Sequence, residues 1–287
     1  MATIDGRRPT RRTRLAAVAA LTLAAVMVPA CVAAPPPAPV VAIYGDSLVN
    51  SSGAYLETSL GAAAPNHQVL NRNRWGSAVC DWLGQMRTDS AQDVDIVVLA
   101  FFGNMGTPCT ADSARTERYA EDATAAVELW QARGTKVILV ASPAQTGTGP
   151  ADSEVMNAFR SVAEAHPGVR FVDAGTGFVD PGTGQYGAVL ACRSGEPCVD
   201  GVTVVRSPDH IHLCDHDALR SLICPSSAAG VRRFVAPIAA AVAAARAQLG
   251  NAATSSNAFA VVAPESTAST ETAAAIETAA SREVSGS

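Results

Sequence analysis

The chain has 287 residues, of which 48% are hydrophobic, 16% are charged and 5% are aromatic. This apolar content is enough for one large or two small folded domains and excludes a wholly disordered chain. The net charge is −5, and the only dense basic block lies at the N-terminus, which argues against a nucleic-acid-binding protein.

Residues 1–34 have the pattern of an export signal. Five arginines between Arg7 and Arg14, in a stretch that loosely resembles a twin-arginine signal, precede an apolar run from Leu15 to Ala30. This run is shorter than the roughly 20 residues that a spanning helix needs. A secretory signal is therefore favoured over an uncleaved membrane anchor, and its removal would leave a net charge of −9.

Seven cysteines agree with export into an oxidising compartment. Cys31 lies at the signal boundary in a stretch that resembles a bacterial lipobox, so lipidation of Cys31 and simple cleavage after Ala34 both remain open. The other six fit three disulfides, although six cysteines allow many pairings. Proximity favours two pairs and leaves a third: Cys192 with Cys198, Cys214 with Cys224, and Cys80 with Cys109.

Strand and helix patterns alternate after a Pro-rich spacer at 35–39. We expect buried strands at 40–44, 68–72, 95–102, 136–141 and 169–173, and helices at 53–60, 79–87, 113–133, 152–166 and 226–249. Continuously apolar strands that alternate with helices predict a parallel sheet covered on both faces. Right-handed crossovers then place every strand-to-helix loop at one edge of the sheet.

Two segments depart from this alternation. Residues 174–208 are rich in glycine and predict a long loop with short strands. Residues 251–287, which follow Gly250, are rich in Ala, Ser, Thr and Glu and predict a disordered tail, with an amphipathic helix over Ala273–Ala280 as the alternative. The folded domain is therefore expected to span residues 40–250.

Polar residues that can carry chemistry follow the predicted strands. Ser47 stands after the first strand in a Gly-Asp-Ser-Leu tetrapeptide, Gly76 follows the second strand, and Asn104 follows the third. A serine near a helix N-terminus suits nucleophilic catalysis, because N–H groups there can hold an oxyanion. Each motif by itself also fits a simple turn or helix cap.

Three histidines cluster near the end of the domain. Asp209 precedes His212 by three residues, a spacing that lets the carboxylate bind one ring nitrogen while the other faces outward, as in a hydrolytic triad. The alternative is a zinc-type metal site that combines His210, His212 and His216 with acidic neighbours, namely Asp209, Asp215 and Asp217. Simple surface polar residues are a third interpretation.

Taken together, Ser47, Gly76, Asn104, Asp209 and His212 resemble the motifs of the SGNH hydrolases, also called GDSL esterases, in a bacterial, actinobacterial-like member. The resemblance covers about residues 38–250 and implies a three-layer α/β/α sandwich with a parallel, flavodoxin-like sheet. By this resemblance Ser47 is the nucleophile, His212 is the base that Asp209 orients, and no cofactor or metal is required. The N–H groups of Ser47 and Gly76 and the Asn104 amide form the oxyanion hole.

The chain departs from the family pattern around the asparagine, which often lies in Gly-x-Asn-Asp. Here Phe102 takes the first position and Met105 the last. We therefore expect an exported serine esterase that cleaves lipid or O-acyl carbohydrate esters, with a pocket lined by loops 106–112, 142–150 and 174–208. An acyltransferase and a non-catalytic cell-envelope binding protein on the same fold are the alternatives.

Overall fold

The computed structural model describes residues 38–111, 114–214 and 223–259. The predicted export signal with Cys31, the acidic residues Asp215 and Asp217, His216, and the chain after residue 259 lie outside the described residues.

The core of the fold is a parallel sheet of five strands in the order β2-β1-β3-β4-β5. The strands are β1 Val40–Gly45, β2 Gln68–Asn73, β3 Val94–Phe101, β4 Lys136–Ala141 and β5 Arg170–Asp173. Every neighbouring pair is parallel. This order is that of flavodoxin-like folds, so the predicted fold class is confirmed, with ligand sites expected beyond the carboxyl ends of the strands.

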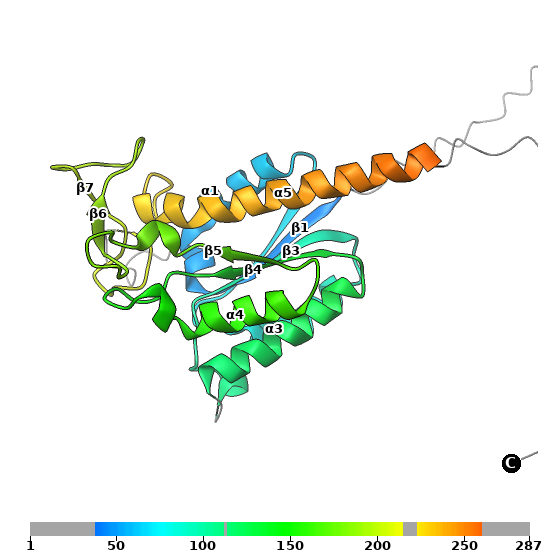
Figure 1. Cartoon of the computed structure of the whole chain (residues 1–287), viewed down its shortest axis with the longest axis horizontal. Coiled ribbons are helices and arrows are strands. Elements are labelled where there is room, and N and C mark those ends of the chain that lie inside the picture. The colour runs from blue at the N-terminus through cyan, green and yellow to red at the C-terminus, as the bar shows by residue number, and fades with distance from the viewer. Residues whose placement is uncertain (1–37, 112–113, 215–222, 260–287) are drawn as a thin grey trace, which may run out of the picture. The chain divides into compact units, whose positions relative to one another are not determined.

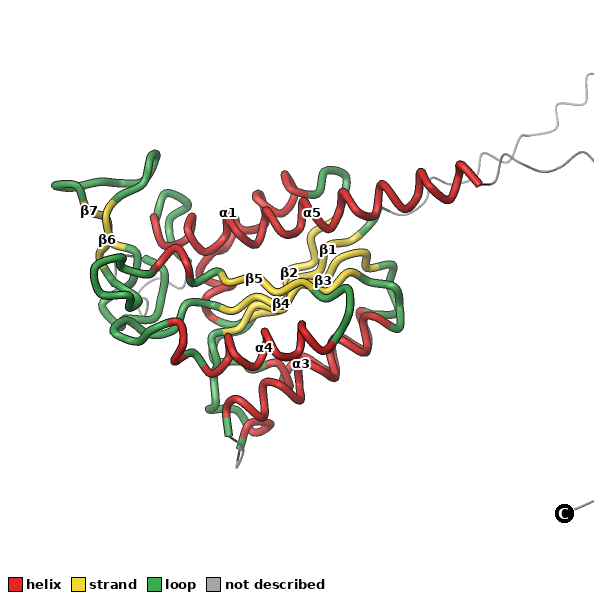
Figure 2. The backbone as a smooth tube through the Cα atoms, in the orientation of Figure 1, coloured by secondary structure: helices red, strands yellow, loops and turns green. Residues whose placement is uncertain are grey.

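Helices cover both faces of this sheet (Figures 1 and 2). Helices α1 (Ser47–Ala63) and α5 (Ala229–Phe259) pack together on one face, and α3 (Arg115–Gln131) and α4 (Glu154–Ala165) pack together on the other. The short helix α2 (Leu83–Asp89) follows a 3₁₀ turn at Val79–Trp82. Two apolar clusters fill the layers, because the central strands carry apolar side chains on both faces.

The two largest errors in the predicted helix boundaries both involve glycine. Helix α1 begins at Ser47 rather than at Gly53, whose φ of 45° only kinks the helix. Helix α5 was expected to end at Leu249, but Gly250 keeps a helical backbone and the helix continues to Phe259. Residues 251–259 are therefore helical and not part of the predicted disordered tail. Gly250 does not adopt the left-handed backbone with which glycine commonly ends a helix.

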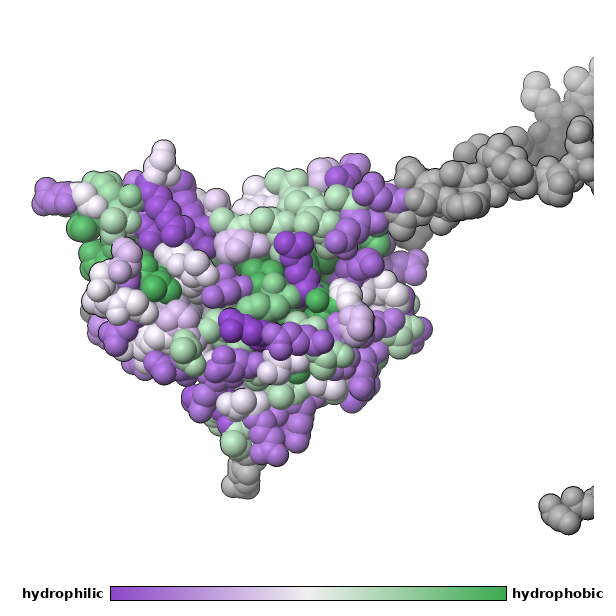
Figure 3. Space-filling model, in the orientation of Figure 1, coloured by the Kyte–Doolittle hydropathy of each residue, from purple (hydrophilic) through white to green (hydrophobic). Residues whose placement is uncertain are grey.

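The glycine-rich segment after β5 contains a small antiparallel hairpin, β6 (Val189–Ala191) and β7 (Val202–Val204). Its outer valines are exposed, and hydrophobic side chains reach the surface at this end of the molecule (Figure 3). A cavity of about 240 Å³ lies between this hairpin and the start of α5. No helix within the described ranges is long and apolar enough to cross a membrane.

Three disulfides join the described cysteines in the expected pairs: Cys192 with Cys198 and Cys214 with Cys224, which proximity favours, and the remaining pair, Cys80 with Cys109. The first pair links the 3₁₀ turn after β2 to the one after β3, Pro108–Thr110. It therefore ties together two loops at the carboxyl edge of the sheet.

Replacing both Cys80 and Cys109 by serine should lower the free energy of unfolding by about 3 kcal/mol, because the bridge closes a loop with a sequence separation of 29. Urea denaturation measures this loss. The matched control replaces Cys192 and Cys198, whose separation of 6 predicts a smaller loss. Free thiols at Cys80 or Cys109 in peptide maps of the unreduced protein would contradict the pairing.

Candidate active site

The carboxylate of Asp46 lies beneath the site, between the ends of β1 and β3. Its Oδ1 accepts a hydrogen bond from the N–H of Leu48 at 3.0 Å and so caps α1. Its Oδ2 accepts from the N–H of Phe102 at 2.6 Å and from the Asn104 amide at 3.2 Å. One buried side chain therefore connects the first strand, the first helix and the loop after the third strand.

The environment of Asp46 shifts its titration. The side chain is fully buried, and burial raises its pKa to about 6 by disfavouring the charged carboxylate. The N–H groups of Phe102 and Leu48 oppose this shift by stabilising the charge. Near neutral pH the carboxylate is ionised and accepts all three of its hydrogen bonds.

Ser47 is the first residue of α1 and is only 7% exposed. The preceding Gly45 has no room for a side chain, because a Cβ there would lie 2.2 Å from Val49 Cγ2 and 2.8 Å from the Ala100 carbonyl oxygen. This close approach lets the chain turn directly from strand into helix. The Ser47 N–H stands in the first helical turn, where such groups have no partner within the helix. The Ser47 hydroxyl makes no hydrogen bond to the described residues.

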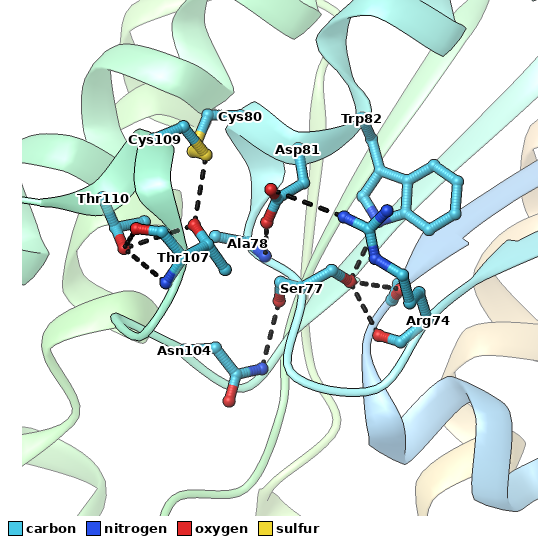
Figure 4. A network of polar contacts seen from close by, with 11 residues as sticks. Arg74, Ser77, Ala78, Cys80, Asp81, Trp82, Asn104, Thr107, Cys109 and Thr110 are labelled. Atoms are coloured by element: carbon cyan, nitrogen blue, oxygen red, sulfur yellow. Dashed lines mark hydrogen bonds and ion pairs between the residues drawn. A yellow bond between two sulfur atoms is a disulfide. The ribbon is translucent and has the colours of Figure 1, made fainter.

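The Asn104 amide makes two hydrogen bonds, and Figure 4 shows the one to Ser77. Its Nδ2 donates to Asp46 Oδ2 at 3.2 Å and to the carbonyl oxygen of Ser77 at 3.1 Å. The Tyr119 hydroxyl donates to the Asn104 carbonyl at 3.1 Å. Both amide hydrogens are therefore engaged, so donation to an oxyanion requires that one of these bonds be shared or released.

Gly76 lies in the loop after β2, directly before Ser77. Its φ of 69° is in the left-handed region that favours glycine, and its N–H makes no hydrogen bond within the described part of the chain. The Ser77 hydroxyl anchors this loop by donating to the carbonyls of Arg74 at 2.8 Å and Gly45 at 3.2 Å. The Trp82 indole donates in turn to the Ser77 hydroxyl at 3.0 Å (Figure 4).

His212 and Asp209 form the predicted pair. His212 Nδ1 lies 2.6 Å from Asp209 Oδ2, and Asp209 Oδ1 accepts from the N–H groups of His212 at 3.0 Å and Ile211 at 2.9 Å. Burial opposes ionisation of Asp209, but these hydrogen bonds outweigh it and hold its pKa below the ordinary value. The carboxylate therefore accepts from Nδ1–H, which leaves Nε2 as the basic nitrogen.

His212 Nε2 is buried and has no hydrogen-bond partner among the described residues. The hydrogen bond that would join it to the Ser47 hydroxyl is thus not formed in this structure. Such bonds are often long before substrate binds. The imidazole stacks on the indole of Trp75, with ring centroids 4.5 Å apart. Because Trp75 adjoins Gly76, this contact brings the histidine loop to the same edge as the other site residues.

His210 takes no part in this pairing. Its φ of 65° turns the loop, and its Nδ1 lies 2.8 Å from the Thr146 hydroxyl. In the described part of the chain no three His, Cys, Asp or Glu side chains come together as a metal site. His216, the third histidine of the metal alternative, lies outside the described residues.

Two residues near the site are not found from the sequence. The Arg206 guanidinium is 1% exposed and donates to the carbonyls of Ile211, Pro143 and Ala144, the last two at 2.8 and 2.9 Å. Burial lowers the Arg206 pKa to about 9. Trp75 is the second. The only feature of the sequence that points to Trp75 is its position directly before Gly76, and this does not predict its contact with His212.

No protein-family model and no curated protein matches the chain. Solved structures similar to it include the acetyl xylan esterase AlAXEase, at 15% identity over 71% of this chain and 99% of that one, with a TM-score of 0.48. The C-terminal catalytic domain of Streptococcus pneumoniae peptidoglycan O-acetyltransferase A matches at 18% identity over 73% and 95% of the two chains, with a TM-score of 0.44.

A GDSL-like lipase from Bacteroides thetaiotaomicron matches at 15% identity over 72% of this chain and 88% of that one, with a TM-score of 0.44. At these identities and TM-scores, the similarities assign no activity, substrate or residue role to this chain.

The titration of Asp46 predicts a pH dependence of stability. Because its pKa rises from 3.8 to about 6 in the fold, its contribution to the free energy of unfolding is complete below about pH 4 and is lost as the pH rises through 6. Relative to Asp46→Asn, the free energy of unfolding of the wild-type protein should fall by roughly 2 kcal/mol between pH 4 and 7. Urea denaturation of both proteins at several pH values measures the difference, and parallel curves would contradict it.

Proposed function

We propose that this protein is an exported serine esterase of the SGNH hydrolase family that works through an acyl-enzyme. The observation that carries the proposal is the state of His212. Asp209 binds its Nδ1 at 2.6 Å, while its buried Nε2 has no partner among the described residues. The ring also stacks on Trp75, whose indole donates to Asn50 in α1, the helix that begins at Ser47. An imidazole held in this way can accept a proton at Nε2 and so act as a general base.

The reaction follows from this arrangement. His212 Nε2 takes the proton of the Ser47 hydroxyl as Oγ attacks the ester carbonyl carbon. The tetrahedral intermediate then collapses, and His212 returns the proton to the alcohol oxygen as the carbon–oxygen ester bond breaks. Water enters next, loses a proton to His212 and attacks the carbonyl carbon of the acyl-enzyme. As the bond from that carbon to Oγ breaks, His212 returns the proton to Oγ, which releases the carboxylic acid and restores the Ser47 hydroxyl.

Three donors are proposed to hold the oxyanion: the N–H groups of Ser47 and Gly76 and the amide of Asn104. The first two are available, since neither N–H makes a hydrogen bond to the residues that the structure describes. The Asn104 amide must share a hydrogen with Asp46 or Ser77, so its donation is tied to the position of both. Loss of one such donor typically costs about 10²- to 10³-fold in rate.

A cavity of about 320 Å³ next to Gly103 is the proposed substrate pocket. The loop expected at 142–150 contributes Gln145 and Thr148 to it, and charged side chains of Arg115, Asp152 and Glu154 line it as well. Arg115 and Glu154 form an ion pair of 2.9 Å whose side chains are about half exposed. A long alkyl chain would displace water from these charges, so the pocket favours a short acyl group on a polar alcohol.

An acyltransferase and a non-catalytic envelope protein are the two alternatives, and each differs from the proposed esterase in the fate of the acyl group. An acyltransferase would pass the acyl group from Ser47 to an alcohol rather than to water. A non-catalytic envelope protein would form no acyl-enzyme. Three disulfides agree with the proposed export in each case.

Replacing Ser47 by alanine should abolish hydrolysis of p-nitrophenyl acetate and labelling by a fluorophosphonate, because the attacking oxygen is gone. His212→Ala should lose nearly all turnover, whereas the matched control His210→Ala should keep most of it, since His210 bonds Thr146 and not Asp209. Turnover that survives in Ser47→Ala above a few per cent would refute the nucleophile. Inhibition by chelators together with an essential His210 would favour the metal alternative.

A chain-length series tests the pocket. With p-nitrophenyl acetate, butyrate, octanoate and dodecanoate, kcat/KM should fall beyond the butyrate ester, because longer chains must lie against Arg115 and Glu154. Glu154→Leu should partly restore hydrolysis of the octanoate ester. If the octanoate ester is the best substrate of the wild-type protein, this cavity is not the acyl pocket.

A further inference from the structure

Trp75 makes a contact with His212 that the proposed chemistry does not use. The two rings stack with centroids 4.5 Å apart and planes 22° apart, so the indole covers one face of the imidazole. The Asp209 carboxylate holds Nδ1 in the ring plane at 2.6 Å. A carboxylate at one corner still permits the ring to tilt about that hydrogen bond, whereas a flat surface against its face does not.

A series of hydrogen bonds between side chains fixes the position of the indole. Trp75 Nε1 donates to Asn50 Oδ1 at 2.6 Å, Asn50 Nδ2 donates to Asn73 Oδ1 at 2.6 Å, and Asn73 Nδ2 donates to Asn71 Oδ1 at 2.7 Å. Asn71 Nδ2 then donates to Glu57 Oε1 at 3.0 Å. The indole N–H only donates and the carboxylate only accepts, so the two ends determine the orientation of all three amides.

This series of hydrogen bonds links Trp75 to α1, the helix that begins with Ser47. Asn50 lies three residues after Ser47 in α1, and its N–H donates to the Asp46 carbonyl at 3.0 Å in the first helical turn. Its side chain reaches from that turn to Trp75. The contacts therefore run from the helix that carries Ser47, through Asn50 and Trp75, to the face of His212, although Ser47 and His212 share no hydrogen bond.

We propose that Trp75 is a positioning residue that sets the plane of the His212 imidazole relative to Ser47, and that Asn50 transmits the position of α1 to it. This rests on the proposed function. The indole face also faces the positive charge that forms when His212 takes the serine proton, an arrangement that aromatic rings stabilise. Both effects act on the chemical step and not on substrate binding.

Two variants of Trp75 separate the effect of its ring, which stacks on His212, from that of its hydrogen bond to Asn50. Trp75→Leu removes both and should lower kcat by about 10- to 100-fold with KM changed less than about threefold, because a misplaced base slows proton transfer. Trp75→Phe keeps a ring against His212 and should recover most of this loss. Gln131→Ala is the control, since Gln131 also donates a side-chain hydrogen bond, to the carbonyl of Pro167 at 2.9 Å, but lies at the end of α3 away from His212.

Asn50 supplies an independent variant should Trp75→Leu fold poorly. Asn50→Ala should lower kcat in the wild-type background but not in Trp75→Phe, which lacks the N–H that Asn50 accepts. An unchanged kcat in Trp75→Leu, a rise in KM alone, or equal losses in Trp75→Leu and Trp75→Phe would each overturn the proposal. These outcomes require an active wild-type protein, whereas failure of the proposed function would leave no Ser47-dependent turnover at all.

Discussion

The arrangement of the site depends on the buried carboxylate of Asp46. It accepts three hydrogen bonds, one from the start of α1 and two from the loop after β3. Ser47 follows the end of β1 and Asn104 follows the end of β3, so this one side chain sets the distance between the two segments. Three N–H groups from two segments offset part of the cost of this buried charge, and the remaining cost raises the pKa of Asp46.

The histidine half of the site has no strand or helix to position it. His212 lies in a loop, and the buried guanidinium of Arg206 organises that loop by donating to the carbonyl of Ile211 and to two carbonyls beyond β4. The face of Phe178 lies 4.7 Å from this guanidinium. A cation that binds several carbonyls at once can replace regular secondary structure, because it satisfies acceptors that would otherwise be buried without partners.

The two halves meet at the loop after β2. Ser77 in this loop accepts from the Asn104 amide, and Trp75 covers His212. The disulfide between Cys80 and Cys109 ties the same loop to the segment that follows Asn104. The Asn104 side and the His212 side of the candidate site are therefore both attached to one short stretch of chain, in which Gly76 lets the backbone turn left-handed.

The sequence by itself determined the parallel sheet, because strands that are apolar on both faces and alternate with helices have few other ways to be buried. It also placed Ser47, Gly76 and Asn104 at one edge, since each follows a strand. It could not determine where α1 begins or α5 ends, because glycine permits both a helical and a left-handed backbone. Only the tertiary structure decided that Arg206 is buried, that both Asn104 hydrogens are engaged and that Trp75 stacks on His212. These contacts join residues far apart in the chain, and no local pattern encodes them.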